Sequence, residues 1–213
     1  MPRARVGENA TSARKCKSAL IEHFQPRFLL ALTATPDRSD GADLLARCWE
    51  NLAYRCDLLA GITRELLCPF HYYGVPDVVD YRNIPWRNGR FDPDALEAAL
   101  AVRARPTDNA LAQYRRHGGT RTLAFCCSQR HADFMNAFFG DNGLRSVAVH
   151  SGTTSSPRAQ SLQRLADGQL DVICCVDIFN EGLDLPAVDT VLLLRPTESK
   201  ILWFQQFGRG LRT

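Results

Sequence analysis

The chain has 213 residues, which is enough for one large domain or two small ones. With 45% hydrophobic and 23% charged residues, its composition is ordinary for a soluble globular protein. The apolar runs are too short to cross a bilayer, and the N-terminus has no apolar segment of signal-peptide length, so we expect a cytoplasmic protein without a membrane partner. Residues 1–27 carry six Lys/Arg against two Glu, and they account for the net charge of +3. The overall charge is therefore weak support for nucleic-acid binding.

Short, continuously apolar runs alternate with helical patterns along most of the chain. Runs without polar alternation are typical of strands that are buried on both faces of a parallel sheet. The alternation of strands and helices predicts a three-layer α/β domain with a mainly parallel sheet and right-handed crossovers. In chain order, the predicted strands are residues 27–33, 122–127, 146–150, 171–176 and 190–194.

Four segments between or before these runs predict helices. Asp92 is the expected N-cap of a helix over 92–101, with Pro93 at its first position, and a second helix is expected over 106–117. The third segment begins near Ser128 and the fourth follows a Ser-Pro start and ends at Gly168. Their expected buried stripes are Ala132, Met135, Phe138 and Phe139 in the third, and Ala159, Leu162 and Leu165 in the fourth.

The stretch from about residue 66 to residue 120 interrupts this alternation. It begins with turn residues and mixed strand signals, which are typical of a connector, and ends at the Gly118-Gly119 turn. We therefore place a domain boundary near residue 65. Residues 1–65 are interpreted as the tail of one α/β unit, and residues 66–213 as most of another.

Four of the eight cysteines form two adjacent pairs, Cys126-Cys127 and Cys174-Cys175. Each pair lies in an apolar run, and adjacent residues of a strand point to opposite faces of the sheet. Neither pair has the spacing of a zinc site. We interpret these cysteines as small core residues of a reduced protein, and we expect no metal site.

Four short stretches carry the candidate chemistry, and three of them directly follow predicted strands. Ligands of open α/β sheets collect at the carboxyl ends of strands, so these three are expected to line one edge. The stretches are Thr33-Ala34-Thr35-Pro36, Phe125-Cys126-Cys127-Ser128, Asn180–Pro186 (NEGLDLP) and Gln205–Arg212 (QQFGRGLR).

In this order, the stretches resemble motifs III, IV, V and VI of the C-terminal half of superfamily-two, DEAD/DEAH-type helicases. The sequence looks most similar to bacterial type III restriction "Res" subunit-like helicases. The resemblance covers about residues 20–213, and the last two stretches at this separation are its most specific part. It implies that 66–213 is a second RecA-like domain and that 1–65 is the end of a first one.

Proteins of this kind bind ATP between two RecA-like domains, so the resemblance implies ATP and Mg²⁺ as cofactors. Arg209 and Arg212 lie three residues apart, which on a helix places both guanidinium groups on one face, and such groups bind phosphate oxygens well. By resemblance, Arg212 is the arginine finger and Arg209 contacts the γ-phosphate or couples the domains. An arginine finger is worth on the order of 10³–10⁵ in rate.

The resemblance implies roles for further residues of the nucleotide site. Gln205 would hydrogen-bond the nucleotide or the facing domain, Asp184 would reach the ribose or orient the last stretch, and Gly182 and Gly208 would permit close backbone approach. Thr33 and Thr35 would couple the nucleotide state to domain movement, because hydroxyls exchange hydrogen-bond partners readily. Each position also has a plain structural interpretation, such as a turn, a cap or an exposed helical side chain.

Relatives lay a nucleic-acid strand across both domains and hold its phosphates with hydroxyls, backbone N–H groups and a few cations. Val176 departs from the pattern, because many relatives have a threonine there that touches the strand. The expected partner is DNA, with RNA not excluded. The candidate contacts, which an ordinary polar loop would also explain, are Ser128, Gln129, Arg130, His150, Ser151 and Thr153.

The sequence contains no G-x-x-x-x-G-K-[ST] phosphate loop. We therefore expect that the chain is part of a longer protein, that a first RecA-like domain absent from it binds most of the ATP and Mg²⁺, and that the chain alone is inactive. Two alternatives remain: a helicase-like interaction module without catalysis, and the motor subunit of a restriction enzyme.

Overall fold

The computed structural model describes residues 23–24, 27–28, 30–33, 51–75, 81–87, 90–92, 95–96, 99, 104–176, 188–196 and 199–211. The chain divides into two compact units, residues 1–53 and 54–213. Helix α3 (Leu58–Thr63), on the N-terminal side of the boundary expected near residue 65, lies in the second unit. The assignment of the flanking segments to two RecA-like domains stays a prediction.

The strand predicted over 27–33 is wrong for the residues of that run that the structure describes, 27–28 and 30–33, which form no strand. Phe28, Leu30 and Leu32 are all exposed there. A strand is stable only when a neighbour pairs with its backbone and covers its apolar side chains. An apolar run therefore does not form a strand where these partners are lacking.

The second unit is built on a parallel sheet of four strands in the order β4-β5-β3-β6. Every described pair in it is parallel, and the strands align without offset, with Phe125 opposite both Cys175 and Leu193. The four predicted strands after residue 120 are thus confirmed, and so is the α/β fold class. The bounds are β3 Thr122–Phe125, β4 Ser146–Val149, β5 Val172–Cys175 and β6 Thr190–Leu193.

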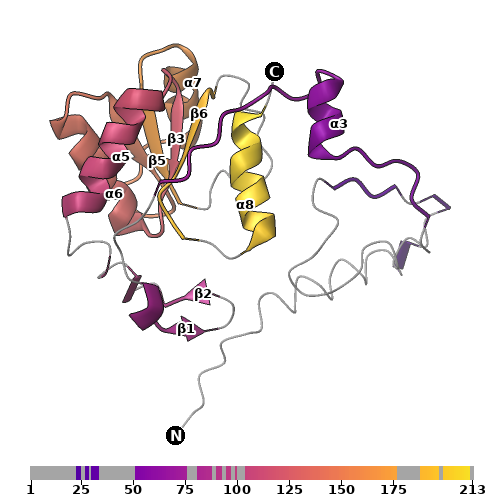
Figure 1. The fold of residues 1–213 in the computed structure, drawn as a ribbon, viewed down its shortest axis with the longest axis horizontal. Coiled ribbons are helices and arrows are strands. Elements are labelled where there is room, and N and C mark those ends of the chain that lie inside the picture. The colour runs from indigo at the N-terminus through magenta and orange to yellow at the C-terminus, as the bar shows by residue number, and fades with distance from the viewer. Residues whose placement is uncertain are drawn as a thin grey trace, which may run out of the picture. The chain divides into compact units, whose positions relative to one another are not determined.

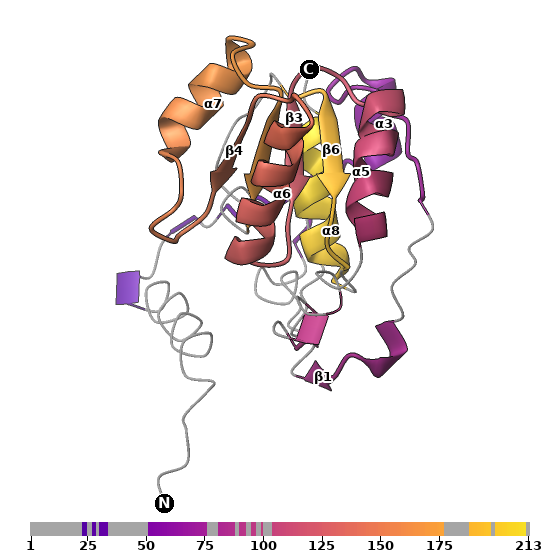
Figure 2. The ribbon, with the colours of Figure 1, turned by 90° about the vertical axis from the view of Figure 1, so that its left-hand side faces the viewer.

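Helices cover both faces of this sheet, which makes the domain three-layered (Figure 1). Helices α5 (Ala104–His117) and α6 (Gln129–Asp141) pack on one face, where Ala124, Cys126 and Cys174 are buried with them. Helix α7 (Arg158–Ala166) packs on the other face against Phe125 and Cys175. Figure 2 shows α5 and α6 side by side in front of the sheet. The adjacent cysteines Cys174 and Cys175 thus lie in two different cores, as the strand pattern predicted.

Helices α6 and α7 follow the buried stripes predicted from the sequence in part. In α6, the Ser128 side chain caps the helix, and Ala132, Met135 and Phe139 are fully buried. In α7, Leu165 is buried, but Ala159 is exposed and Ser161 is buried in its place. At about 100° per residue, positions 159 and 165 lie about 120° apart around a helix, so both cannot face one core. The Ser161 hydroxyl is satisfied by donating to the Pro157 carbonyl at 2.8 Å.

Ion pairs and capping carboxylates hold the amino ends of the strands. Asp171, just before β5, accepts hydrogen bonds from the backbone N–H and the guanidinium of Arg145, just before β4. Asp189, just before β6, accepts from the backbone N–H groups of Thr120 and Arg121. The carboxylates at this edge therefore bond within the fold. We take the opposite edge, at the carboxyl ends of the strands, as the candidate site.

The remaining elements of the second unit are short. A one-turn 3₁₀ helix, η1 (Tyr81–Asn83), precedes a two-stranded antiparallel ribbon of β1 (Trp86–Arg87) and β2 (Arg90–Phe91). Asp92 accepts from the Ala95 N–H at 3.1 Å, as expected of an N-cap. The chain continues after β6 into α8 (Lys200–Phe207) and the 3₁₀ turn η2 (Gly208–Gly210). None of the helices in the described part of the chain has the length and apolarity needed to cross a membrane.

Candidate functional site

The carboxyl ends of the strands form one polar edge, as the sequence predicted. Because the strands are parallel and in register, the residues after Phe125, Val149 and Cys175 emerge together. Those residues include Ser128, His150 and Val176. The structure therefore brings two of the sequence-predicted stretches, 126–130 and 150–153, to the same edge.

A direct hydrogen bond joins these two stretches. The Gln129 side-chain amide donates to the Ser151 hydroxyl at 2.9 Å. Ser128 accepts from the His131 N–H at 3.1 Å, which caps the start of helix α6 at this edge. Gln129, Arg130 and Ser151 are exposed, and so is Thr153. This group presents hydroxyl, amide and guanidinium donors to solvent, the set that phosphate oxygens accept.

His150 differs from its neighbours because its imidazole points inward. Only 1% of the side chain is exposed, and Nε2 lies 3.0 Å from Oδ1 of Asp133 on α6. Nδ1 accepts from the Gly152 N–H at 3.0 Å. The sequence suggested His150 as a nucleic-acid contact, whereas the structure places its side chain beneath the loop.

Asp133 is the acidic member of this cluster, and sequence reasoning missed it. It also accepts from the Thr154 hydroxyl at 2.8 Å. Partial burial acts to raise the pKa of Asp133, but the hydrogen bonds from His150 and Thr154 outweigh it and hold the pKa below its ordinary value. Only helical periodicity, which places residue 133 on the face beside β4, could have indicated it.

The stretch with the candidate arginines is not one continuous helix. Helix α8 ends at Phe207, and Arg209 lies in the 3₁₀ turn η2, where 7% of it is exposed. Gln205 is half-buried in the last turn of α8, next to the fully buried Gln206. A Cβ on Gly208 would meet nothing within 4 Å, so the described structure contains no close approach there.

Five candidate residues are not placed in the second unit by the described structure. Thr33 is described and exposed, but it belongs to the first unit. Four further residues lie outside the described residues: Thr35, Gly182, Asp184 and Arg212.

An extended segment packs against helix α8 and the turn η2. The sequence suggested only a connector for this segment. We call Cys68–Val75 the strap. The backbone N–H of Cys68 donates to the Leu211 carbonyl at 3.0 Å, and its thiol donates to the Gly210 carbonyl at 3.3 Å. Phe70 contacts the Phe207 ring edge-on with centroids 4.7 Å apart. The strap therefore bonds to Gly210 and Leu211, the two residues that follow Arg209 in the chain.

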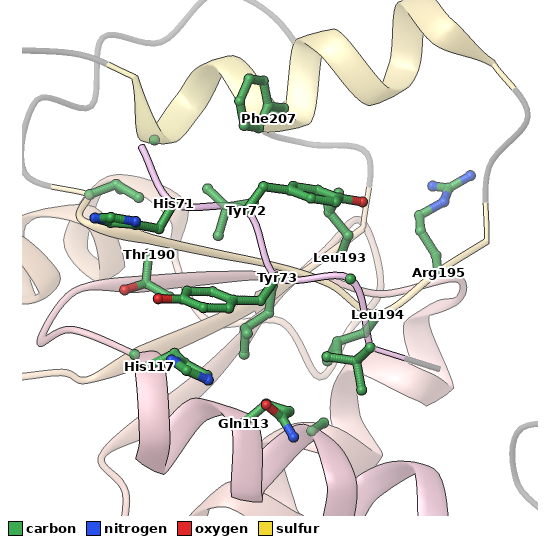
Figure 3. A pocket seen from close by; sticks show the side chains of 18 of the residues that line it. His71, Tyr72, Tyr73, Gln113, His117, Thr190, Leu193, Leu194, Arg195 and Phe207 are labelled. Atoms are coloured by element: carbon green, nitrogen blue, oxygen red, sulfur yellow. The ribbon is translucent and has the colours of Figure 1, made fainter. Parts of the chain in front are cut away.

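A groove of about 1100 Å³ lies between the strap, helix α5 and strand β6 (Figure 3). Tyr73 of the strap stacks on His117 of α5 with ring centroids 3.8 Å apart. Leu193, Leu194 and Arg195 line the β6 side. Arg195 follows β6 at the polar edge, and sequence reasoning missed it because its run ends in an ordinary Arg-Pro.

The described residues contain no group of three or more His, Cys, Asp or Glu side chains that could hold a metal ion. Cys126 and Cys174 are buried, and a hydrogen bond between their thiols together with burial raises the pKa of Cys126. Burial also raises the pKa of Cys127 to about 11. The thiols of Cys126 and Cys127 are therefore protonated at neutral pH and are poor nucleophiles and ligands.

The model of the helicase conserved C-terminal domain matches residues 106–213, which is half of the chain. The match spans β3 to η2, and so includes the whole sheet and the polar edge. The chain belongs to this family. The match agrees with the RecA-like fold class expected from the sequence.

Three curated relatives are similar to this chain over part of their own length. It is 26% identical over 216 residues to a Saccharomyces cerevisiae protein named "Putative ATP-dependent helicase IRC3", covering 97% of this chain and 31% of that protein. A 51.5 kDa protein of a Lactococcus phage is 26% identical over 184 residues, with 86% and 40% covered. UvrABC system protein B of Chlorobium limicola is 35% identical over 89 residues, with 41% and 13% covered. The chain thus spans less than half the length of each of these relatives.

Distant likenesses were also found among solved structures. The E. coli DEAD-box protein SrmB, bound to the regulator of ribonuclease activity A, matches with a TM-score of 0.45 at 18% identity, covering 49% of this chain and 61% of that one. The Hef helicase domain of Pyrococcus furiosus matches with a TM-score of 0.39 at 24% identity, covering 55% and 27%.

Proposed function

We propose that this chain is the second motor domain of an ATP-dependent DNA helicase or translocase. Membership of the helicase C-terminal domain family supports the class of protein. The observation that carries the proposal is Arg209, a nearly buried guanidinium held at the end of α8. A guanidinium held in one position is suited to stabilising developing phosphate charge, because it needs no reorganisation during the reaction.

In this proposal, Arg209 and Arg212 meet the γ-phosphate of ATP bound mainly by a first RecA-like domain together with Mg²⁺. Phosphoryl transfer spreads negative charge over the γ-oxygens and the leaving group, and a fixed arginine stabilises that charge. Gln205 contributes a hydrogen bond to the nucleotide or to the facing domain. The supporting roles proposed for Gly182, Asp184, Gly208, Thr33 and Thr35 are those implied by the motifs.

The nucleic-acid strand is proposed to cross the polar edge of the sheet. Ser128, Gln129 and Ser151 offer neighbouring donors at this edge, joined by the 2.9 Å bond between Gln129 and Ser151. Arg130 and Thr153 extend the same exposed surface. Hydroxyl and amide donors bind the backbone without reading sequence, as a translocating motor requires. DNA is the proposed substrate, and RNA is the alternative that binding assays distinguish.

The test is DNA-stimulated ATP hydrolysis by the protein extended upstream through an ATP-binding domain. Arg212→Ala is expected to lower the rate by at least about 10³-fold, within the range of an arginine finger. Arg209→Ala is expected to lower kcat more than it raises KM, because the charge it stabilises develops in the transition state. Arg116→Ala, an exposed arginine on α5, is the matched control and should match the parent. The 213-residue chain alone should hydrolyse no ATP.

If the extended protein is inert, or if both arginine variants match the parent, the catalytic proposal is wrong. The interaction module would then be the better explanation of the retained domain. A restriction-enzyme motor subunit of the type III "Res" class would pass the same test, since its motor chemistry is the same. Double-strand cleavage by the full protein would separate that case from a free helicase.

A further inference from the structure

The loop that follows β4, residues 150–155, is tied to helix α6 by side-chain bonds of His150 and Thr154 to Asp133 and of Ser151 to Gln129. The imidazole of His150 is almost fully buried and bonds on both sides, to Asp133 through Nε2 and to the Gly152 N–H through Nδ1. Sequence reasoning assigned this histidine to the exposed surface. Its contacts indicate a different use.

These two contacts fix the proton positions on the ring. A backbone N–H can only donate, so Nδ1 of His150 must accept from Gly152 and carries no proton. The single ring proton is then on Nε2, which donates to the Asp133 carboxylate at 3.0 Å. The side chain is therefore held as the neutral Nε2–H tautomer.

The loop has little freedom around this ring. The His150 N–H donates to the Ser155 hydroxyl at 2.9 Å, and the Ser155 N–H donates to the Gly152 carbonyl at 3.3 Å. A Cβ on Gly152 would lie 2.5 Å from Oε1 of Gln129 and 3.0 Å from the His150 ring. Gly152 is thus pressed between the ring and Gln129, and its missing side chain permits this approach.

The exposed part of the loop faces outward from these contacts. Ser151 accepts from Gln129 at 2.9 Å, and Ser151 and Thr153 are exposed on the polar edge. The position of these groups therefore depends on the inward bonds of His150. A change at the His150 ring would therefore also move the exposed side chains of Ser151 and Thr153.

We propose that His150 is a positioning residue for nucleic-acid binding: its neutral imidazole, held between Asp133 and Gly152, fixes the loop so that Ser151 and Gln129 meet the backbone of a strand. This inference rests on the proposed nucleic-acid role of the same edge. His150 itself does not touch the strand.

The arrangement predicts a dependence on pH. A protonated imidazole carries N–H groups on both nitrogens, so Nδ1–H would oppose the Gly152 N–H and release the loop. Asp133 on α6 is the charged group that faces the ring among the described residues. On the loop the ring meets Gly152 and Thr154, which do not titrate. Acid therefore removes the acceptor and leaves the bond to Asp133.

Two substitutions of His150 separate its bond to Gly152 from its bond to Asp133. His150→Asn retains an oxygen near the Nδ1 position that can accept from Gly152, but it does not reach Asp133. His150→Gln retains a donor near the Nε2 position, but it removes the acceptor for Gly152. We expect His150→Gln to weaken binding more than His150→Asn. His117→Asn, an exposed histidine on α5, is the control for ordinary histidine titration.

The experiment measures the Kd of the chain for a fluorescein-labelled oligothymidylate by anisotropy from pH 5.5 to pH 8. The ratio of the His150→Gln Kd to the wild-type Kd is expected to be about fivefold at pH 7.5, since a lost hydrogen bond is worth about 1 kcal/mol. It should fall toward one where acid protonates the ring, because the wild type then also lacks the acceptor for the Gly152 N–H. The ratio for His117→Asn should stay flat.

A ratio for His150→Gln that stays the same from pH 5.5 to pH 8 would overturn the proposal, because it would mean that the residue only supports the fold. Nitrogen-15 NMR of the wild-type ring gives a second readout that needs no variant. A protonated Nδ1 at pH 7.5 would also overturn it. If the wild-type chain binds no oligothymidylate at any pH, the nucleic-acid role of the edge fails first, and the positioning role falls with it.

Discussion

The backbone N–H of Cys68 donates a hydrogen bond of 3.0 Å to the carbonyl oxygen of Leu211. The first of these residues begins the strap, and the second directly follows the turn that carries Arg209. The segment that enters the helicase domain and the segment that bears its candidate arginine are therefore one packed unit.

The aromatic contact between the strap and α8 should contribute to stability. Phe70→Ala removes the edge-on contact with Phe207, whose centroid lies 4.7 Å away, and is expected to cost about 1–2 kcal/mol. Val75→Ala, at the other end of the strap and with the same 41% exposure, is the matched control and should cost less than about 0.5 kcal/mol. Urea unfolding monitored by circular dichroism measures both. Equal losses would mean that the strap contributes no specific contact to α8.

Two glycines are expected to respond oppositely to the same substitution. A Cβ on Gly119 would collide with the Asp189 carboxylate, so Gly119→Ala should destabilise by about 1–3 kcal/mol. A Cβ on Gly140, inside α6, would meet nothing within 4 Å, so Gly140→Ala should stabilise by about 0.5–1 kcal/mol. Thermal unfolding of the two variants decides it. Destabilisation by Gly140→Ala would show that α6 ends before that residue in solution.

Helix α6 offers a similar comparison between its buried and exposed faces. Phe139 is fully buried, and Phe139→Ala is expected to cost about 3–5 kcal/mol because it leaves a cavity between the helix and the sheet. Phe134 is 52% exposed on the same helix, and Phe134→Ala should cost about 1 kcal/mol or less. Chemical denaturation gives both values. Similar costs would contradict the assigned helix face.

The ion pair at the amino end of β5 makes stability depend on pH. The hydrogen bond from Arg145 lowers the pKa of Asp171 below its ordinary value. A lowered folded-state pKa stabilises the protein above the unfolded-state value of about 3.9, and this stabilisation is lost as pH falls through the folded-state pKa. Wild type should thus have a higher Tm than Asp171→Asn at pH 7, with the gap closing toward pH 3. A gap that does not depend on pH would assign the effect to packing alone.

The burial of the cysteine pairs predicts an order of reactivity. Cys56 is exposed, whereas Cys127 is partly buried with its pKa raised to about 11. At pH 8, iodoacetamide should modify Cys127 at least about a hundredfold more slowly than Cys56, because the thiolate is the reacting form. Peptide mass spectrometry over a time course measures both rates in the native protein. Equal rates would mean that the end of β3 opens freely.

The sequence by itself determined the parallel sheet, because β3, β4, β5 and β6 are apolar runs whose period and length leave little choice. It also predicted that residues 128–130 and 150–153 lie at one edge, since parallel strands must end together, whereas the stretches 33–36 and 180–186 are not placed there by the described residues. The strand predicted over residues 27–33 was wrong for 27–28 and 30–33, the part of this run that the structure describes. Local propensity cannot supply the neighbour that a strand requires.

Only the tertiary structure decided how the side chains of that edge are used. The sequence grouped His150 with Ser151 as surface contacts, and the fold turned the imidazole inward toward Asp133 of another element. It likewise could not show that the strap packs on α8, because that contact joins segments far apart along the chain. The existence of the four strands follows from the apolar runs, whereas their order in the sheet comes from the structure. The direction of one side chain depends on what the rest of the chain places beside it.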